Sequence, residues 1–406
     1  MADKRQALSN VEGEVELRGD LAFRVPLGAA MAAQAEEAEP SLTHAFHTYP
    51  ARMHPAVARV VLDEFFMGAG SEVLDPFCGG GTVPVEALVR GWRCLGSDLD
   101  PLAIRLSRVK TERRRAKART RFLDALGAVA AASTRRVRGR VDVRAKLSAA
   151  ERSWYQVHVL KELAGLLEEI RAVRDERDRL ALEMVFSAIV VKFSRQRSET
   201  AQHEVDKRIR KGLVTEFFHR KGEELVAAWT ELSEALPSPH HAPRFVLSDA
   251  RKLAHTLSGE YRCDLVLSSP PYGGTYDYVR HHARRHAWLG INPKQLERHE
   301  IGARRHGSRG KKSAAIERWD REVSGVLRTL ATVLRPEGIA VLLVGDGEIA
   351  GRRIAADRQL ETLAPRYAFE LLAVASQPRP DWRGGMPRRE HLVALRRTRE
   401  ILSPGG

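Results

Sequence analysis

Two short segments of the chain contain residues whose types and spacing could support chemistry. The first is V-L-D-P-F-C-G-G-G-T, from Val73 to Thr82, where a hydrophobic strand runs into three glycines and then a helix. Glycines let a ligand approach the backbone closely, and the N-terminus of the helix offers free N–H groups. The spacing is neither that of a phosphate loop nor the G-x-G-x-x-G of a dinucleotide site. The turn therefore indicates a small-molecule site of another kind.

The next strand places an acidic residue where many nucleotide-binding folds hold a ribose. It ends at Gly96-Ser97-Asp98, about twenty residues after the glycine turn, and a carboxylate at that point can accept both ribose hydroxyls. We predict this role for Asp98. Asp100 directly precedes Pro101, so we predict that it caps the following helix.

The second segment is D-L-V-L-S-S-P-P-Y, from Asp264 to Tyr272, in which an apolar strand ends in a proline turn. Ligands bind at the carboxyl ends of strands in open α/β sheets. Two prolines make the turn rigid, Ser269 adds a side-chain acceptor, and Tyr272 adds a flat π-face. A plain structural turn is the alternative, but a chain that already carries a glycine turn for a ligand favours a second functional segment.

The residues D-P-F-C-G-G-G-T resemble the first motif of the class I methyltransferases that modify amino groups of DNA bases. H-T-Y-P-A-R-M-H-P, from His47 to Pro55, resembles the segment that precedes this motif. The resemblance implies an α/β, Rossmann-like class I methyltransferase fold and S-adenosyl-L-methionine as the cofactor. Asp249, just past a third strand, resembles the position that binds the adenine amino group, with a plain turn residue as the alternative. Besides Asp98 and Asp249, the residues implied to bind the cofactor are Tyr49, Pro50, Asp75, Pro76, Phe77, Cys78, Gly79, Gly81 and Thr82.

S-P-P-Y resembles the fourth motif of the amino-methyltransferases, which implies that Ser269, Pro270, Pro271 and Tyr272 are the catalytic residues. An aromatic amine is a poor nucleophile because its lone pair is delocalised into the ring. If the Ser269 hydroxyl and the Pro270 carbonyl accept its two N–H bonds, the lone pair can turn toward a sulfonium methyl while Tyr272 stacks on the base. Positioning and fixed dipoles would then supply most of the catalysis.

Serine in this motif favours cytosine N4 in DNA as the acceptor, since related enzymes acting on adenine N6 or guanine N2 more often have Asp or Asn there. Adenine-N6 methylation of DNA and guanine-N2 methylation of RNA stay open as alternatives. A catalytically inactive nucleic-acid-binding protein is the non-enzyme alternative. Cytosine C5 chemistry is disfavoured because it needs a nucleophilic cysteine, usually after a proline, and no Pro-Cys pair occurs. We therefore predict a site-specific DNA methyltransferase, with a cognate restriction endonuclease as a candidate partner.

The charge of the chain also favours a nucleic-acid partner, DNA first and RNA as the alternative. The formal net charge is +15 over 406 residues, and Lys and Arg that displace phosphate counterions supply most non-specific nucleic-acid affinity. A basic protein that is merely soluble is the competing explanation. A base inside a duplex must be flipped out to be methylated, so phosphate contacts are needed. The predicted contacts are Arg113, Arg114, Arg115, Lys117, Arg195, Arg197, Arg304, Arg305, Lys311 and Lys312.

The hydrophobic pattern divides the chain into a catalytic domain and a helical insertion. Residues 41–110 and 240–397 alternate strands and helices, and residues 111–239 show helical spacing, which we interpret as a target-recognition region. Residues 1–40 are predicted to be a weakly ordered arm with room for one short strand, and 398–406 a tail. The last two strands, 369–375 and 391–395, have no helix between them, which predicts an antiparallel pair at the edge of a mostly parallel, seven-stranded sheet.

The remaining polar residues suggest no metal site and no disulfide. Cys78, Cys94 and Cys263 lack zinc or disulfide spacing, and the N-terminus lacks an apolar signal segment, so a cytoplasmic location is expected. The i, i+4 pair His282 and His286 could bind metal, but no carboxylate joins it at ligand spacing in the sequence. The segment R-R-E-H, residues 388–391, precedes the last strand, and no chemistry is assigned to it.

Overall fold

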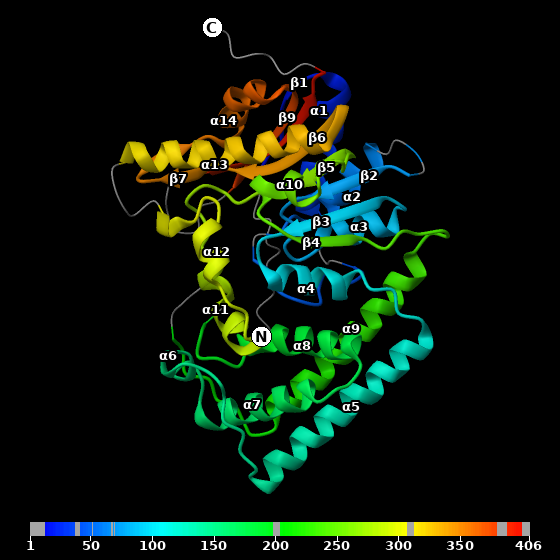
Figure 1. Ribbon diagram of the computed structural model, residues 1–406, viewed down its shortest axis with the longest axis vertical. Helices are drawn as coiled ribbons and strands as arrows, with labels where there is room; N and C mark the ends of the chain where they lie inside the picture. The colour runs from blue at the N-terminus through cyan, green and yellow to red at the C-terminus, as the bar shows by residue number, and fades with distance from the viewer. Residues whose placement is uncertain are drawn as a thin grey trace.

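The computed structural model describes residues 13–36, 41–50, 52–65, 68, 70–197, 204–306, 312–379 and 388–399. Its centre is an eight-stranded sheet in the order β1-β9-β10-β6-β5-β2-β3-β4, in the upper half of Figure 1. A separate hairpin pairs β7 with β8. The strands are β1 Glu16–Gly19, β2 Glu72–Asp75, β3 Arg93–Asp98, β4 Arg244–Leu247, β5 Cys263–Ser268, β6 Leu334–Gly345, β7 Gly347–Ile349, β8 Arg352–Ile354, β9 Phe369–Arg379 and β10 Arg388–Arg397.

The expected α/β fold with a mostly parallel sheet is confirmed, with two differences at one edge. Strands β4, β3, β2, β5 and β6 pair in parallel, and β10 is antiparallel to both β6 and β9. The antiparallel strand therefore lies inside the sheet instead of at its edge. Residues 390–395 of β10 are all buried, which suits an inner strand because both of its faces are covered. The eighth strand, β1, pairs antiparallel with β9 and forms the edge.

Helices cover both faces of the sheet, because alternate residues of the central strands point to opposite sides. Val73 and Leu265 pack with α1 and α2 on one face, whereas Leu74 and Val266 pack with α13 and α14 on the other. These and the remaining helices of this half are α1 Leu21–Glu36, α2 Pro55–Glu64, α3 Thr82–Val89, α4 Pro101–Lys110, α10 Leu253–Thr256, α13 Lys312–Val333 and α14 Ala356–Leu363, with short 3-10 turns η1 Ala250–Lys252, η2 Arg304–His306 and η3 Ala364–Tyr367.

The N-terminal segment differs from the weakly ordered arm that was expected. Residues 13–36 form β1 and α1, and Leu27, Ala30 and Met31 on α1 are fully buried. The physical reason is that α1 covers apolar residues of β9 and β10 that would otherwise face water. Residues 1–12, 37–40 and 400–406 lie outside the described part of the chain.

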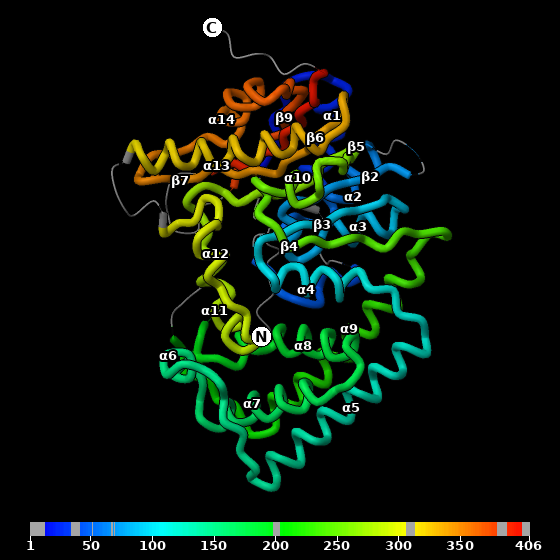
Figure 2. Tube along the Cα trace, viewed as in Figure 1, coloured from blue at the N-terminus to red at the C-terminus, as the bar shows by residue number. Residues whose placement is uncertain are grey.

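A helical segment lies between α4 and β4, and its role as a target-recognition region stays a prediction. Its described helices are α5 Ala116–Gly139, α6 Ala149–Arg152, α7 Val157–Arg171, α8 Glu176–Val190 and α9 Leu213–Ala235. They gather below the sheet, and α11 (Tyr278–Leu289) and α12 (Lys294–His299) connect the two halves (Figure 2). One apolar core joins the insertion to Leu102 and Leu106 of α4 and to Trp288 of α11. The insertion is therefore continuous with the half of the molecule that contains the sheet.

Candidate active site

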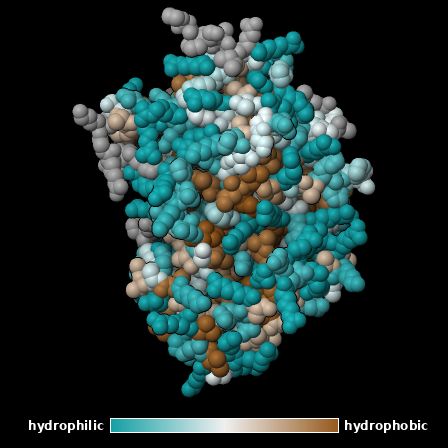
Figure 3. All heavy atoms as spheres, viewed as in Figure 1, coloured by the Kyte–Doolittle hydropathy of each residue, from teal (hydrophilic) through white to brown (hydrophobic). Residues whose placement is uncertain are grey.

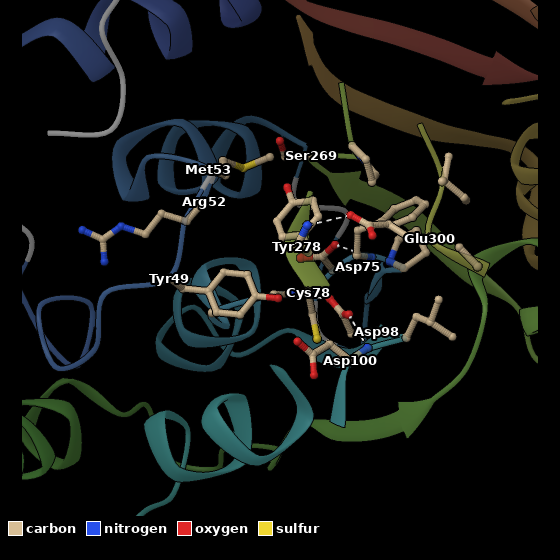
Figure 4. A pocket seen from close by; sticks show the side chains of 18 of the residues that line it. Tyr49, Arg52, Met53, Asp75, Cys78, Asp98, Asp100, Ser269, Tyr278 and Glu300 are labelled. Atoms are coloured by element: carbon tan, nitrogen blue, oxygen red, sulfur yellow. Dashed lines mark hydrogen bonds between the residues drawn. The ribbon is translucent and has the colours of Figure 1, made fainter. Parts of the chain in front are cut away.

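A cavity lies at the carboxyl ends of β2, β3, β4 and β5, with about 820 Å³ of empty space that is partly open to solvent. Figure 3 shows apolar residues gathered across the middle of one face, between the two halves of the molecule. We call the cavity at the ends of these four strands the cofactor cavity. It is lined by Tyr49, Arg52, Met53, Asp75, Pro76, Phe77, Cys78, Gly79, Gly80, Thr82, Val83, Asp98, Leu99, Asp100, Asp249, Ala250, Ser269, Pro271, Tyr278, Leu296, His299, Glu300 and Ile301. Figure 4 shows how several of these side chains surround the space.

The glycine turn forms one wall of the cofactor cavity, and Tyr49 packs directly on it. A Cβ atom added to Gly79 would lie 3.0 Å from Cε1 of the Tyr49 ring, so only glycine lets the ring approach this closely. Tyr49 is 5% exposed and lines the cavity, whereas Pro50 is buried and lies outside its lining. Gly81 also lies outside the lining; it forms the left-handed N-cap of α3.

Thr82 provides the observation that tests whether a polar ligand fits here. Its hydroxyl is buried at the first position of α3, lines the cavity, and has no hydrogen-bond partner among the described residues. A buried hydroxyl without a partner costs free energy, and a carboxylate at a helix N-terminus is a favourable partner. The donor set of this wall therefore fits the amino-acid end of S-adenosylmethionine.

Asp98 ends β3 and fits the role of a ribose acceptor. Its Oδ2 accepts the Gly79 N–H and its Oδ1 accepts the Asp100 N–H, both at 2.9 Å. One lone-pair direction on each oxygen stays available for a ligand hydroxyl. Burial raises the pKa of Asp98 to about 7.

Asp75 ends β2 and has a structural as well as a lining role. Its Oδ1 accepts the Ser268 hydroxyl at 2.6 Å and the Phe77 N–H at 3.1 Å. These bonds join the end of β2 to the end of β5, so the glycine turn and the acceptor segment are held at a fixed separation. Burial raises the pKa of Asp75 to about 7, although both hydrogen bonds lower it.

Asp100 caps α4 as predicted, and it also meets the histidine pair of α11. Its Oδ1 accepts the Leu102 N–H at 2.9 Å, while His282 Nδ1 lies 2.7 Å from Oδ2 and His286 Nε2 lies 3.0 Å from Oδ1. The sequence shows no carboxylate at ligand spacing from this pair, but the fold brings Asp100 to it although Asp100 and His282 are 182 positions apart. Burial alone would raise the pKa of Asp100, but the histidine hydrogen bonds outweigh it and hold that pKa well below its usual range.

The histidine cluster forms a hydrogen-bonded network with Asp100 through one ring nitrogen of each histidine, whereas His282 Nε2 and His286 Nδ1 are buried without a partner among the described residues. Burial lowers the pKa of His282 to about 4, so the imidazole is neutral and donates to a charged carboxylate. A second buried group with possible ligand atoms is Asp346, Asp357 and His391. There, Arg353 donates to Asp346, and Arg18 donates to Asp357. No metal was predicted, and that stays a prediction.

Asp249 lies at the cavity wall beyond β4, but its carboxylate is engaged by a cation. Arg251 donates to both carboxylate oxygens, from Nη2 at 2.6 Å and from Nε at 2.9 Å. Burial would raise the pKa of Asp249, but the Arg251 hydrogen bonds lower it overall. Arg251 also donates to the His299 carbonyl at 2.9 Å, which connects this wall to α12. A role in binding the adenine amino group stays a prediction.

The acceptor segment lies between the cofactor cavity and a second, apolar cavity. Ser269 and Pro271 line the cofactor cavity, and Pro270, Pro271 and Tyr272 line the second one. This second space, which we call the acceptor cavity, lies at the ends of β5 and β6 and has about 510 Å³ of empty space, including space that is open to solvent. The two cavities share Phe77, Pro271 and Ile301. The structure thus brings Ser269 to the predicted cofactor residues and places Tyr272 on the far side of the proline turn.

The loop after the acceptor segment is clamped by residues that the sequence did not single out for this role. Glu300 accepts the Tyr278 N–H at 2.7 Å, and Arg305 donates to both Glu300 and Asp277. Burial raises the pKa of Glu300 to about 7. Figure 4 shows Glu300 and Tyr278 beside the cavity.

Several lining residues were missed in the sequence. Gly80 and Met53 lie inside the two segments that resemble methyltransferase motifs, so their position in the sequence could have predicted that they line the cavity. Leu296 and His299 come from α12, whose short polar sequence carries no signal for ligand contact.

The predicted phosphate contacts separate into structural and exposed residues. Arg114 is buried, donates to Asp178 and the Arg177 carbonyl, and lies 4.3 Å over the Trp229 ring. This corrects the prediction for Arg114. Arg305 is half-buried and donates to Glu300 and Asp277, and a phosphate contact by Arg305 stays a prediction. Arg195 is half-buried. The exposed members are Arg113, Arg115, Lys117, Arg197 and Arg304. Lys311 and the Lys312 side chain lie outside the described part of the chain.

The comparisons with known proteins match parts of this chain to methyltransferases. Residues 44–154 match the family model of the RMKL-like methyltransferase domain. The chain is 39% identical over 72 residues to the type II methyltransferase M.MvaI of Kocuria varians, which is 17% of this chain and 16% of that protein. It is 42% identical over 52 residues to tRNA (guanine(10)-N2)-dimethyltransferase of Methanothermobacter thermautotrophicus, 13% of this chain and 16% of that protein. The chain therefore spans about a sixth of each relative's length.

Solved structures with partial similarity include TrmN from Thermus thermophilus, with a TM-score of 0.32, 15% identity and coverage of 85% of this chain and 49% of that one. The rRNA methyltransferase aviRa from Streptomyces viridochromogenes superposes with a TM-score of 0.31 and 15% identity, covering 85% of this chain and 86% of that one. Superpositions of this quality carry no information on substrate. The family match, together with the α/β sheet, gives the class I methyltransferase fold, and S-adenosylmethionine is the cofactor.

In the described part of the chain, every helix is too short or too polar to cross a lipid bilayer.

Proposed function

We propose that this protein is an S-adenosylmethionine-dependent methyltransferase that methylates an exocyclic amino group of a nucleic-acid base, with cytosine N4 in DNA as the first candidate. The observation that carries this proposal is the junction of the cofactor cavity and the acceptor cavity at Phe77, Pro271 and Ile301. A donor methyl in one cavity and a base amine in the other could meet at the proline turn.

The residues at this junction fit the polar demands of an aromatic amine. Ser269 is half-buried, and two prolines follow it, so the Ser269 hydroxyl and the Pro270 carbonyl are free to accept N–H bonds from a base. The bound cofactor supplies an electrophilic methyl group. Two aromatic side chains, Tyr272 and Trp319, line the acceptor cavity, as is favourable for a flipped base that must stack outside the duplex.

The choice of DNA rests on the serine of S-P-P-Y and on the short match to a type II methyltransferase. A type II relative also makes a cognate restriction endonuclease a candidate partner. RNA is the second candidate substrate, since the other curated relative is named as a tRNA guanine-N2 enzyme. Exposed cations on both halves, such as Arg113, Arg197 and Arg304, are candidate phosphate contacts for either polymer.

One experiment separates these candidates. The full chain is incubated with isotopically labelled S-adenosylmethionine and either genomic DNA or total RNA, and the nucleosides are identified by mass spectrometry. We expect labelled N4-methyl-2′-deoxycytidine in the DNA digest. Label found only as methylguanosine in RNA would replace the first candidate by the second, and binding of nucleic acid without label would favour an inactive binding protein.

A further inference from the structure

The start of β10 lies beside the acceptor segment because this strand runs against its neighbours. In a parallel sheet the carboxyl ends of strands share one edge, so an antiparallel strand brings its first residues to that edge. Glu390 of β10 is paired in register with Gly345 at the end of β6, and Arg388 is paired with Arg379 at the end of β9. The R-R-E-H segment, to which the sequence assigned no chemistry, is thereby placed next to the catalytic residues.

Glu390 contacts Tyr272 directly. The Tyr272 hydroxyl donates to Glu390 Oε1 at 2.6 Å, and both residues are 7% exposed. The Tyr272 ring rests on Gly345, where an added Cβ atom would lie 2.5 Å from ring atoms Cδ2 and Cε2. The ring is thus fixed at its hydroxyl end and along one side.

Arg379 restrains the ring from a third direction. Its guanidinium lies 5.6 Å from the centroid of the Tyr272 ring, and its Nη2 donates to the Tyr276 hydroxyl at 2.9 Å. The Tyr276 ring lies 6.2 Å from the Tyr272 ring. A cation near an aromatic ring attracts it and limits its movement.

Packing alone does not explain these contacts, because burying the Glu390 carboxylate costs free energy. A buried carboxylate must recover its desolvation cost from hydrogen bonds, and an apolar side chain of similar size often gives equal or greater stability. A hydrogen bond from a phenol to a carboxylate is short and directional. It sets the ring angle, which apolar packing alone would leave adjustable.

We propose that Glu390 and Arg379 are positioning residues that hold the Tyr272 ring against the acceptor cavity, in the orientation in which it stacks on the acceptor base. This inference rests on the proposed function, because it names the groups that set one wall of the base-binding site. Glu390 acts through Tyr272 and does not touch the cofactor cavity.

The test compares Glu390→Gln, Tyr272→Phe and the double variant with wild type. The control is Glu370→Gln, which removes an exposed carboxylate paired with Arg396 in the same β9–β10 hairpin. The readouts are kcat for methyl transfer, the Kd of S-adenosylhomocysteine, and the ¹⁹F spectrum of 3-fluorotyrosine incorporated at position 272. We expect Glu390→Gln to lower kcat by about tenfold or more and to leave the Kd within about twofold.

The double variant decides between positioning and two independent effects. If Glu390 acts only through the Tyr272 hydroxyl, the double variant loses no more activity than the worse single variant. The ¹⁹F resonance of residue 272 should shift in Glu390→Gln and stay unchanged in the control. A kcat for Glu390→Gln equal to that of wild type, or a double-variant loss equal to the product of the single losses, would overturn the proposal.

Failure of the proposed function gives a different result. In that case the wild-type protein transfers no methyl group to DNA or RNA, and only the ¹⁹F comparison tests whether Glu390 positions the Tyr272 ring. An unchanged resonance in Glu390→Gln then overturns the positioning role, and a shifted resonance supports it.

Discussion

Replacing Asp98 by asparagine should weaken cofactor binding by an amount that the hydrogen bonds of this residue define. Each carboxylate oxygen accepts one backbone N–H, from Gly79 and from Asp100. Asparagine keeps one acceptor oxygen, and its amide nitrogen must face one of these backbone donors. Hydrogen bonds to a charged group contribute about 1.5–3 kcal/mol, so losing one toward the ribose should raise the cofactor Kd about 10- to 100-fold.

The pH dependence of the same variant provides an independent check. Because the pKa of Asp98 is raised to about 7, the carboxylate ionises as the pH rises through this value, and wild-type affinity should increase over the same range. Without ligand the sign is opposite. The raised pKa stabilises the folded protein at acid pH, and this contribution is lost as the pH rises through about 7. In Asp98→Asn, residue 98 should contribute neither to the pH dependence of cofactor affinity nor to the pH dependence of folding stability.

Isothermal titration with S-adenosylhomocysteine between pH 6 and pH 8 measures the Kd and its dependence on pH. The matched control is Asp142→Asn, which changes an exposed aspartate paired with Lys161 in the helical insertion. A Kd for Asp98→Asn equal to that of wild type, with the same dependence on pH, would refute the ribose role and the reasoning from its two accepted N–H bonds.

Three further outcomes follow from the described contacts. Ser269→Ala should lower kcat about 100-fold with an unchanged cofactor Kd; equal loss of both would place Ser269 with the cofactor instead of the acceptor. Gly81→Ala should lower the thermal midpoint, because φ is +79° at this cap and a left-handed non-glycine residue costs about 1–2 kcal/mol; an unchanged midpoint would contradict this. Arg114→Met should cost about 3 kcal/mol in urea unfolding because it removes the buried ion pair with Asp178. Arg113→Ala should leave stability unchanged and weaken nucleic-acid binding; the reverse pattern would reject the assignment of these two arginines.

The cavity lining around the glycine turn was largely predictable because its residues belong to one continuous strand, turn and helix. Local sequence determines such a unit, and Asp75, Gly79 and Thr82 do line one cavity; that they bind the cofactor stays a prediction. Asp98 was predictable for the same reason, since it ends the adjacent strand. The parts that depend on distant segments were not predictable: α12 reaches the cavity only through the fold, and its sequence shows no ligand signal.

The pattern of charges in the sequence did not predict which arginines are exposed where neighbouring residues have opposite environments. Arg113 is exposed and Arg114 is buried, and nothing in the basic run separates them. The difference arises because α8 places Asp178 beside Arg114, 64 positions away in the chain. The pairing of Asp100 with His282 has the same origin. Burial of a charge is decided by its long-range partner, which a single sequence does not reveal.

The apolar core that the insertion shares with α4 and α11 has a consequence for how this protein could acquire a new target. Removing residues 116–235 would uncover Leu102 and Leu106 of α4, the helix that directly follows Asp100 of the cavity lining, so the insertion cannot be exchanged as an independent unit without loosening the half that contains the sheet. If the insertion recognises the target, as the sequence predicts, new specificity is more accessible through substitutions of solvent-facing side chains on a retained helical scaffold. Engineered chimaeras should accordingly transplant surface positions and leave the buried helix faces untouched.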